Sequence, residues 1–348
     1  MPEGNLRDTD LYLAGSFNSW NPKDPHYCFQ KDSEGIYFFQ AELSAGDYEF
    51  KVTKGSWERV ECNASGADIQ NRMLKLTSDT VVRLIIENWK DRFTRKPRIS
   101  TATRNVHVLD TAFLIPELQR VRRICIYLPV GYGASRQHYP VLYMQDGQNV
   151  FDDSTSFAGE WGVDETLDSL GAHRKQIIVV AIDNGGVKRI NEYCPYDMQN
   201  YGKGEGDRYI EFLVNTLKPF VDKNYRTLKG KQNTFIAGSS MGGLISMYAL
   251  LKYPKVFGGA GVFSPAFWVG PGIFDDINTK GAQVNSKIYF YCGGQEGGRM
   301  EPDMIKAFEE MRAVSKSKMI SSVNPEGKHS EKYWREEFPL FYLWLIEK

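Results

Sequence analysis

The N-terminal stretch of the chain has its apolar residues in short runs. From about residue 10 to residue 87, these runs are four to six residues long and are separated by turn residues such as Ser33-Glu34-Gly35. Apolar and charged positions alternate within Tyr48–Val52, and no window sustains a period of 3.6 residues. This pattern is typical of strands joined by turns. The runs are Leu11–Ala14, Ile36–Ala41, Tyr48–Val52 and Val81–Ile86. We therefore predict a small all-β, immunoglobulin-like sandwich.

The pattern changes after a charged connector, Asn88–Ser100. A length of 348 residues allows about two domains, and we place the first, with its linker, at 1–98 and the second at 99–348. In the second, apolar runs follow a lead-in strand near Arg120–Leu128 and alternate with amphipathic helices that begin near Asp207 and Ser330. The runs are Val141–Met144, Ile177–Ile182, Thr234–Ala237, Val256–Phe263 and Lys287–Tyr291. This alternation predicts an α/β domain with a mostly parallel central sheet covered on both faces.

The segment around Ser240 carries the clearest chemical signal. Gly238–Gly242 matches the pattern GxSxG, and it lies between the apolar run Thr234–Ala237 and a helical run, Leu244–Tyr253. A strand, a sharp turn and a helix are the context that a nucleophile elbow requires. The glycines relieve crowding in the strained turn, and the free N–H groups at the start of the helix can stabilise an oxyanion. We predict that Ser240 is a nucleophile.

A serine nucleophile needs a base and an acid that orients the base. In this arrangement both follow the serine in the chain. Of five histidines, only His329 follows Ser240, and it lies in a polar loop before the last helix. Glu296 is our first choice for the acid because it lies on the loop after the strand candidate ending at Tyr291. Glu301 and Asp303 stay open as alternatives.

Backbone amides and loop side chains complete the predicted site. We expect the amides of Met241, directly after the nucleophile, and Gln148, in the glycine-containing loop after Val141–Met144, to form the oxyanion hole. Several aromatic and basic residues lie in loops after strand candidates, where they can contact a substrate. These predicted substrate contacts are Trp161, Tyr193, Trp268 and Arg189.

Charge and cysteine content narrow the range of partners. Forty-three basic and 43 acidic residues give a net charge of zero, which disfavours nucleic acid and membrane partners. Five cysteines without a CxxC pattern predict no metal site, although a bridge between Cys28 and Cys62 stays open. The start, Met1–Gly4, has no signal-peptide pattern. A cytoplasmic protein and an exported one whose leader was removed both remain open, with periplasmic or extracellular location slightly favoured in the second case. The oligomeric state is open.

Several segments together resemble the putative-esterase branch of the α/β-hydrolases. This branch includes acetylxylan and feruloyl esterases of carbohydrate esterase family 1, S-formylglutathione hydrolase, mycolyltransferases and enterochelin esterases. The resemblance spans about residues 105–348, through Tyr139–Asp152, Ala181–Gly186, the Ser240 elbow and the His329 loop. It implies an α/β-hydrolase fold, a triad of Ser240, Glu296 and His329, and no metal or organic cofactor. Many relatives have Asp as the acid, so Glu296 departs from the commoner pattern.

The N-terminal part resembles a family-48 carbohydrate-binding module, as in the glycogen-binding region of AMP-activated kinase β subunits. The matching segments are Leu11–Pro22, Gly46–Val52 and Gly55–Trp57. Aromatic faces on such a module stack on sugar rings, and Trp20 and Trp57 are the candidates. Similar domains in enterochelin esterases shape the active site instead, and this alternative stays open.

These features predict a serine carboxylic-ester hydrolase that acts on feruloyl or acetyl esters of a plant polysaccharide such as xylan. The rival enzyme is a ferric-siderophore trilactone esterase, whose anionic substrate would favour Lys188, Arg189 and Arg299. A rival from another class is a glycan-binding protein with a degenerate hydrolase domain. The intact order of serine, acid and histidine disfavours this last hypothesis.

Overall fold

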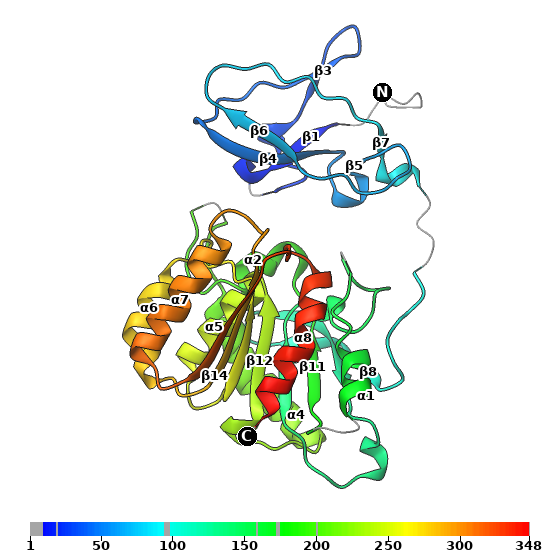
Figure 1. The fold of residues 1–348 in the computed structure, drawn as a ribbon. Helices are drawn as coiled ribbons and strands as arrows, with labels where there is room; N and C mark the ends of the chain where they lie inside the picture. The colour runs from blue at the N-terminus through cyan, green and yellow to red at the C-terminus, as the bar shows by residue number, and fades with distance from the viewer. Residues whose placement is uncertain are drawn as a thin grey trace. The chain divides into compact units, whose positions relative to one another are not determined.

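The computed structural model describes residues 10–18, 20–93, 98–157, 159–171, 175–199 and 201–347. The chain start Met1–Gly4 and Ser19, within the matching segment Leu11–Pro22, lie outside these residues. So does the linker segment 94–97. The chain folds as two units, Met1–Pro97 and Arg98–Lys348 (Figure 1).

The first unit consists of small β-sheets, which confirms the predicted all-β class. A three-stranded antiparallel sheet has the order β1-β4-β6, and two further strand pairs accompany it. The strands are β1 (Tyr12–Gly15), β2 (Gln30–Lys31), β3 (Tyr37–Phe38), β4 (Gly46–Thr53), β5 (Glu61–Cys62), β6 (Arg72–Leu76) and β7 (Asn88–Trp89). A small core holds these sheets together, and its buried members are Leu11, Val52, Ile86 and Trp89.

One detail of this unit differs from the sequence-based expectations, and the open question of a bridge between Cys28 and Cys62 is answered. The run Val81–Ile86 forms no strand; Ile86 enters the core, whereas Val81 is fully exposed. The apolar content of a segment therefore did not show whether that segment forms a strand that pairs with another strand. Cys28 and Cys62 are both free thiols.

The second unit is built on an eight-stranded, mostly parallel sheet, as predicted. Its order is β15-β14-β13-β12-β10-β11-β9-β8, in which β8 and β9 form the antiparallel edge and the other strands run parallel to one another. The strands are β8 (Val106–Ile115), β9 (Arg120–Tyr127), β10 (Val141–Met144), β11 (Ile178–Ile182), β12 (Thr234–Ser239), β13 (Gly259–Phe263), β14 (Lys287–Gly293) and β15 (Lys318–Asn324).

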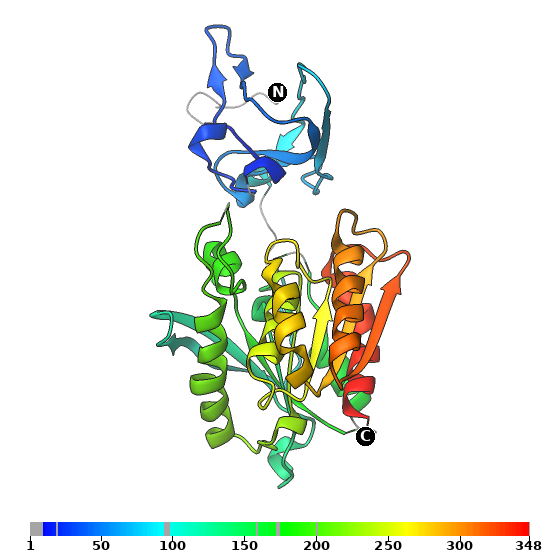
Figure 2. The same ribbon diagram turned by 90° about the vertical axis from the view of Figure 1, so that its left-hand side faces the viewer.

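Helices cover both faces of this sheet because the strands are apolar on both sides (Figures 1 and 2). Residues of α1 and α8 form one core with one face, and residues of α3, α5, α6 and α7 form a second core with the other. The helices are α1 (Val163–Gly171), α2 (Arg189–Glu192), α3 (Gly206–Phe212), α4 (Lys218–Asn224), α5 (Met241–Lys252), α6 (Gly272–Lys280), α7 (Met300–Val314) and α8 (Glu331–Ile346).

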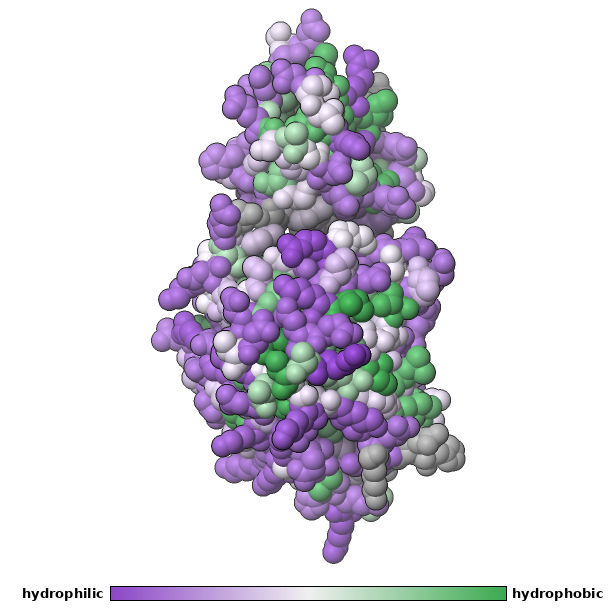
Figure 3. Space-filling view, turned by 60° about the vertical axis from the view of Figure 1, so that its left-hand side comes forward, coloured by the Kyte–Doolittle hydropathy of each residue, from purple (hydrophilic) through white to green (hydrophobic). Residues whose placement is uncertain are grey.

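Polar residues dominate the face of the second unit that Figure 3 shows. In the face drawn in Figure 3, apolar side chains appear as small separate groups among polar ones. Across the described ranges, no helix combines the length and the apolar character that crossing a membrane requires.

The parallel strands fix where side chains with chemical function can gather. In a parallel sheet, the loops that follow the strands all lie at the same edge, and ligands bind there. The loops after β10, β12, β13, β14 and β15 are therefore neighbours. Since β12 lies between β13 and β10, the loops after these two strands flank the residue that follows β12.

Candidate active site

Ser240 occupies a strained turn between β12 and α5. Its backbone has φ 59° and ψ −121°, a conformation that costs an L-residue other than glycine on the order of 1–3 kcal/mol. Two backbone hydrogen bonds hold the turn: Ser240 N donates to Phe263 O at 2.9 Å, and Ala266 N donates to Ser240 O at 3.0 Å. The turn is thus tied to the loop after β13.

Close packing leaves no room for a Cβ at Gly238 and little room for one at Gly242. A Cβ at Gly238 would lie 2.9 Å from Gln145 Cβ, and one at Gly242 would lie 3.1 Å from the same atom. Gln145 follows β10 directly, so the elbow is pressed against the neighbouring strand end. Any side chain at Gly238 would push these two loops apart.

Glu296 and His329 form a direct pair. Glu296 Oε2 lies 2.6 Å from His329 Nδ1, and the Glu296 side chain is fully buried. The other carboxylate oxygen, Oε1, accepts hydrogen bonds from Gly293 N and Ser264 Oγ, both at 2.6 Å. Because both carboxylate oxygens accept hydrogen bonds, the orientation of the Glu296 side chain is fixed. Its bond to Nδ1 in turn orients the partly exposed imidazole of His329.

Ser264 and Trp334 support this pair, and neither was among the site residues predicted from the sequence. Trp334 Nε1 donates to Ser264 Oγ at 2.9 Å, so the hydroxyl can donate its own proton to Glu296. The Trp334 ring also meets the His329 ring edge-on, with centroids 5.0 Å apart. Neither residue belongs to a short motif. The only signals are that Ser264 follows an apolar strand and that Trp334 lies one helical turn after the start of α8.

The two other acid candidates are placed differently. Asp303 lies on α7 and pairs with Arg299 at 3.0 Å. Glu301 is exposed on the same helix. Glu296 is the acid candidate that contacts His329.

The loop after β10 is held by charge and by close backbone packing. A Cβ at Gly147 would lie 2.7 Å from Asp183 N, so only glycine fits there. Asp146 has left-handed φ 54° and binds Arg189 through two hydrogen bonds, of 2.6 and 2.8 Å. These contacts fix the position of the short 3-10 turn Gly147–Asn149, which contains Gln148.

The predicted substrate contacts separate into core residues and one exposed aromatic residue. Trp161 is 3% exposed and stacks on Trp334 at a centroid distance of 5.7 Å. Tyr193 is fully buried, and its hydroxyl accepts a hydrogen bond from Asp146 N. Trp268, on the loop after β13, is 42% exposed.

Arg189 is part of the framework of the site. Burial by itself would lower the pKa of Arg189, but the ion pair with Asp146 raises the pKa above its ordinary value. The guanidinium charge is therefore permanent and already neutralised by Asp146. Lys188 ends the short 3-10 turn Gly186–Lys188 before α2. Within the described residues, no group of three or more His, Cys, Asp or Glu side chains is arranged to hold a metal ion.

In the first unit, Trp20 and Trp57 lie beside each other. Their ring centroids are 6.2 Å apart with a 41° tilt, and both rings are partly exposed. Trp20 has a positive φ of 58°, and Gly55 provides a second left-handed turn with φ 85°. Asn18 fixes the first turn because Gly15 N donates to its Oδ1 at 2.9 Å and its Nδ2 donates to Leu13 O at 2.8 Å.

Family models match both units of the chain. Residues 115–344 match the family described as "Putative esterase", and residues 11–88 match the pullulanase X25 domain. The chain is 26% identical over 243 residues to the uncharacterized protein YbbA of Bacillus subtilis, which covers 65% of this chain and 93% of that protein. This chain is also 28% identical, over 220 residues, to an endo-1,4-β-xylanase/feruloyl esterase of Xylanibacter ruminicola. The matched region is 60% of this chain but only 27% of that protein.

The N-terminal unit and the overall fold have further matches. Over 94 residues, 26% of this chain, the identity to an α-amylase of Niallia circulans is 43%, although this covers only 7% of that protein. Among solved structures, the enterobactin esterase FES of Shigella flexneri matches 97% of this chain and 88% of its own, with a TM-score of 0.54 and 15% identity. A ferulic acid esterase matches 70% of this chain and 98% of its own, with a TM-score of 0.53 and 18% identity.

Proposed function

Because this chain belongs to the putative-esterase family and has the α/β-hydrolase fold, we propose that it is a serine carboxylic-ester hydrolase with the triad Ser240, His329 and Glu296. Ser240 Oγ attacks the acyl carbonyl carbon while His329 Nε2 takes the hydroxyl proton. The alcohol leaves with that proton, and the acyl group remains bonded to Oγ. Water then attacks the acyl carbon, with His329 again accepting a proton, and the carboxylic acid is released as the proton returns to Oγ.

The contact between Glu296 and His329 is the observation that carries this proposal. A buried carboxylate at 2.6 Å from Nδ1 keeps the proton on that nitrogen and leaves Nε2 free to act as the base. It also stabilises the imidazolium that forms when Ser240 loses its proton. The amides of Gln148 and Met241 are the proposed oxyanion donors. The glycine packing of Gly147 and the pair between Asp146 and Arg189 would keep the first of these donors in place.

We propose that the substrate is a carbohydrate-linked ester, feruloyl or acetyl. Two observations support this choice: the N-terminal unit matches a pullulanase domain, and the esterase unit is similar to part of a xylanase/feruloyl esterase. The exposed Trp268 beside the elbow offers a flat apolar surface for an aromatic acyl group.

The second candidate is a siderophore trilactone esterase, favoured by the fold match with the enterobactin esterase over 97% of this chain. Two of the cations that an anionic siderophore would need are already paired, Arg189 with Asp146 and Arg299 with Asp303. This charge pairing ranks the siderophore below a neutral carbohydrate ester.

A substrate panel tests the ranking. We expect kcat/KM to be higher for methyl ferulate or acetylated xylan than for ferric enterobactin, each measured with the full chain under the same conditions. Faster hydrolysis of ferric enterobactin would reverse the ranking. Absence of hydrolysis of all these esters and of p-nitrophenyl acetate would contradict the esterase proposal itself.

We further propose that the N-terminal unit binds glycan through Trp20 and Trp57. Replacing Trp57 by Ala should weaken binding to soluble arabinoxylan or glycogen by about fivefold, because stacking of one aromatic ring contributes on the order of 1 kcal/mol. Affinity electrophoresis measures this loss. Phe38→Ala, which removes another exposed aromatic side chain of the same unit, is the matched control and should bind as the wild type does. Equal glycan binding by Trp57→Ala and the wild type would contradict the proposal that Trp20 and Trp57 bind glycan.

A further inference from the structure

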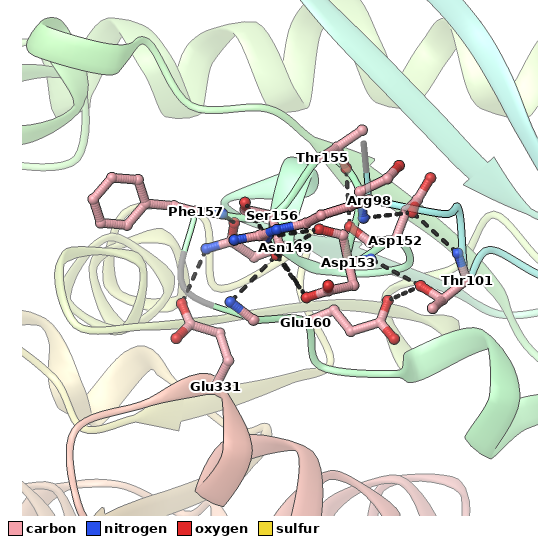
Figure 4. Close-up of polar contacts among 12 residues, drawn as sticks. Arg98, Thr101, Asn149, Asp152, Asp153, Thr155, Ser156, Phe157, Glu160 and Glu331 are labelled. Atoms are coloured by element: carbon pink, nitrogen blue, oxygen red, sulfur yellow. Dashed lines mark hydrogen bonds and ion pairs between the residues drawn. The ribbon is translucent and has the colours of Figure 1, made fainter. Parts of the chain in front are cut away.

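One large apolar side chain is exposed on a loop that the rest of the structure holds firmly. Phe157 is 73% exposed and lies on the loop between β10 and α1. Single exposed apolar residues are common and need no explanation by themselves. Phe157 differs because buried polar side chains fix its backbone beside the candidate active site, and Figure 4 shows its ring directed away from this polar cluster.

Asn149 is the centre of the cluster. Its side chain is 8% exposed, its Oδ1 accepts a hydrogen bond from Phe157 N at 3.0 Å, and its Nδ2 donates to Glu331 Oε1 at 3.0 Å. One amide group thus joins three segments: its own turn after β10, the loop that bears Phe157, and the start of α8 (Figure 4). Because Asn149 adjoins Gln148, and Glu331 is two residues from His329, Phe157 is anchored between two parts of the proposed catalytic machinery.

Glu331, which accepts the hydrogen bond from Asn149, is itself buried. It is 9% exposed, and burial raises the pKa of its carboxyl group. Gly159, two residues after Phe157, has φ 118°, and a Cβ there would lie 3.7 Å from Glu331 Cβ. The loop therefore packs against the start of α8 as well as bonding to it through Asn149.

The other side of the loop is clamped by the segment that opens the second unit. Arg98 Nη1 donates to Asp153 O at 2.9 Å and to Ser156 O and Ser156 Oγ, both at 3.0 Å. Thr101 Oγ1 accepts from Asp153 N at 2.8 Å and donates to Glu160 Oε2 at 2.9 Å (Figure 4). These bonds hold Asp153, Ser156 and Glu160, which lie on both sides of Phe157 in the chain, so local opening of this backbone would have to break several hydrogen bonds.

The order of the strands puts the loops that carry Phe157 and a second exposed aromatic residue, Trp268, on the two sides of the strand that leads to Ser240. The loop after β10 carries Phe157, the loop after β13 carries Trp268, and Ser240 follows β12, which lies between these two strands. Two exposed rings on the loops that flank a nucleophile suit a flat substrate group. Stacking between aromatic rings favours a planar aromatic acyl group over an aliphatic one.

We propose that Phe157 is a specificity-determining residue that contacts the aromatic acyl group of the ester bound at Ser240, and that the Arg98 clamp positions it. This inference rests on the proposed esterase function. It narrows the substrate class from carbohydrate esters in general to esters of aromatic acids such as ferulate. The acetyl alternative has no ring for Phe157 to contact.

Steady-state kinetics on two methyl esters test the proposal. For Phe157→Ala we expect KM for methyl ferulate to rise about fivefold to tenfold, with kcat changed by less than about twofold, because a stacking contact stabilises bound substrate and transition state alike. KM for methyl butyrate, which has no ring in its acyl group, should stay within about twofold. Phe157→Tyr should restore the wild-type KM for methyl ferulate.

Two further variants separate this contact from a structural effect. Leu340→Ala removes another exposed apolar side chain, from α8, and should leave the KM for both esters unchanged. Arg98→Ala should raise KM for methyl ferulate selectively, with a melting temperature close to that of the wild type. Unchanged KM for methyl ferulate in Phe157→Ala would overturn the proposal, and so would equal changes for both esters. If the wild type hydrolyses neither ester, the proposed function fails, and this outcome is distinct from a failure of the Phe157 contact.

Discussion

Replacing Ser240 by Ala is expected to lower kcat for methyl ferulate by about 10⁴-fold or more, with the fold intact. The hydroxyl is the proposed nucleophile, and without it no acyl-enzyme can form. Alanine keeps the packing of the turn and retains its positive φ, so the melting temperature should change little. The activity assay should therefore be accompanied by thermal unfolding of the same preparation.

A second substitution at Ser240 separates the loss of the catalytic hydroxyl from the effect of backbone strain on stability. Ser240→Gly should be equally inactive but more stable, by about 1 kcal/mol, because glycine adopts φ 59° at little cost. Ser239→Ala is the matched control, since the motif contains two adjacent serines, and it should keep activity within about threefold. Full activity in Ser240→Ala, or inactivity only in Ser239→Ala, would contradict the assignment of the nucleophile.

Replacing Glu296 by Gln is expected to lower kcat by about 10³- to 10⁴-fold while KM changes little. All three groups that contact the Glu296 carboxylate, His329 Nδ1, Ser264 Oγ and Gly293 N, can act as donors to it. The amide of glutamine has only one acceptor oxygen, so its NH₂ group would face one of these donors or impose the other tautomer on His329. Either outcome leaves Nε2 protonated or the imidazole misplaced.

The alternative acid from the sequence is the control for Glu296. Asp303→Asn removes a carboxylate that pairs with Arg299, and it should retain activity within about twofold. Steady-state kinetics of both variants on methyl ferulate measure the difference. Retention of more than about a tenth of kcat in Glu296→Gln, or a larger loss in Asp303→Asn, would show that Glu296 is not the acid.

Local sequence patterns were enough to predict the elbow, the parallel sheet and the candidate triad residues. The elbow was visible because glycine spacing, an apolar strand and a helix are all encoded within about twenty residues around Ser240. Apolar runs alternating with helices predicted the parallel sheet correctly, because strands buried on both faces must be apolar throughout. His329 and Glu296 were selected by chain order and by position after a strand, and their contact at 2.6 Å became visible only in the folded chain.

Features that depend on contacts between distant segments were not predictable. Ser264 and Trp334 are 70 residues apart, and their hydrogen bond to each other exists only because β13 and α8 meet at one edge of the sheet. A position after a strand also does not say which way a side chain points. Trp161 and Tyr193 turn into the core, while Phe157, which belongs to no motif, is exposed. The same limit applies to Val81–Ile86, whose apolar composition predicted a strand that does not form.

The most direct test of the central claim is covalent labelling of the full chain with a fluorophosphonate, followed by peptide mass spectrometry. The reagent forms a stable phosphonyl ester with a serine that an imidazole activates. The proposed triad predicts one label per chain, on Ser240, with loss of esterase activity in proportion to labelling. Labelling should be absent in Ser240→Ala and strongly slowed in Glu296→Gln. A label on a different serine, or complete retention of activity after Ser240 is labelled, would show that Ser240 is not the nucleophile.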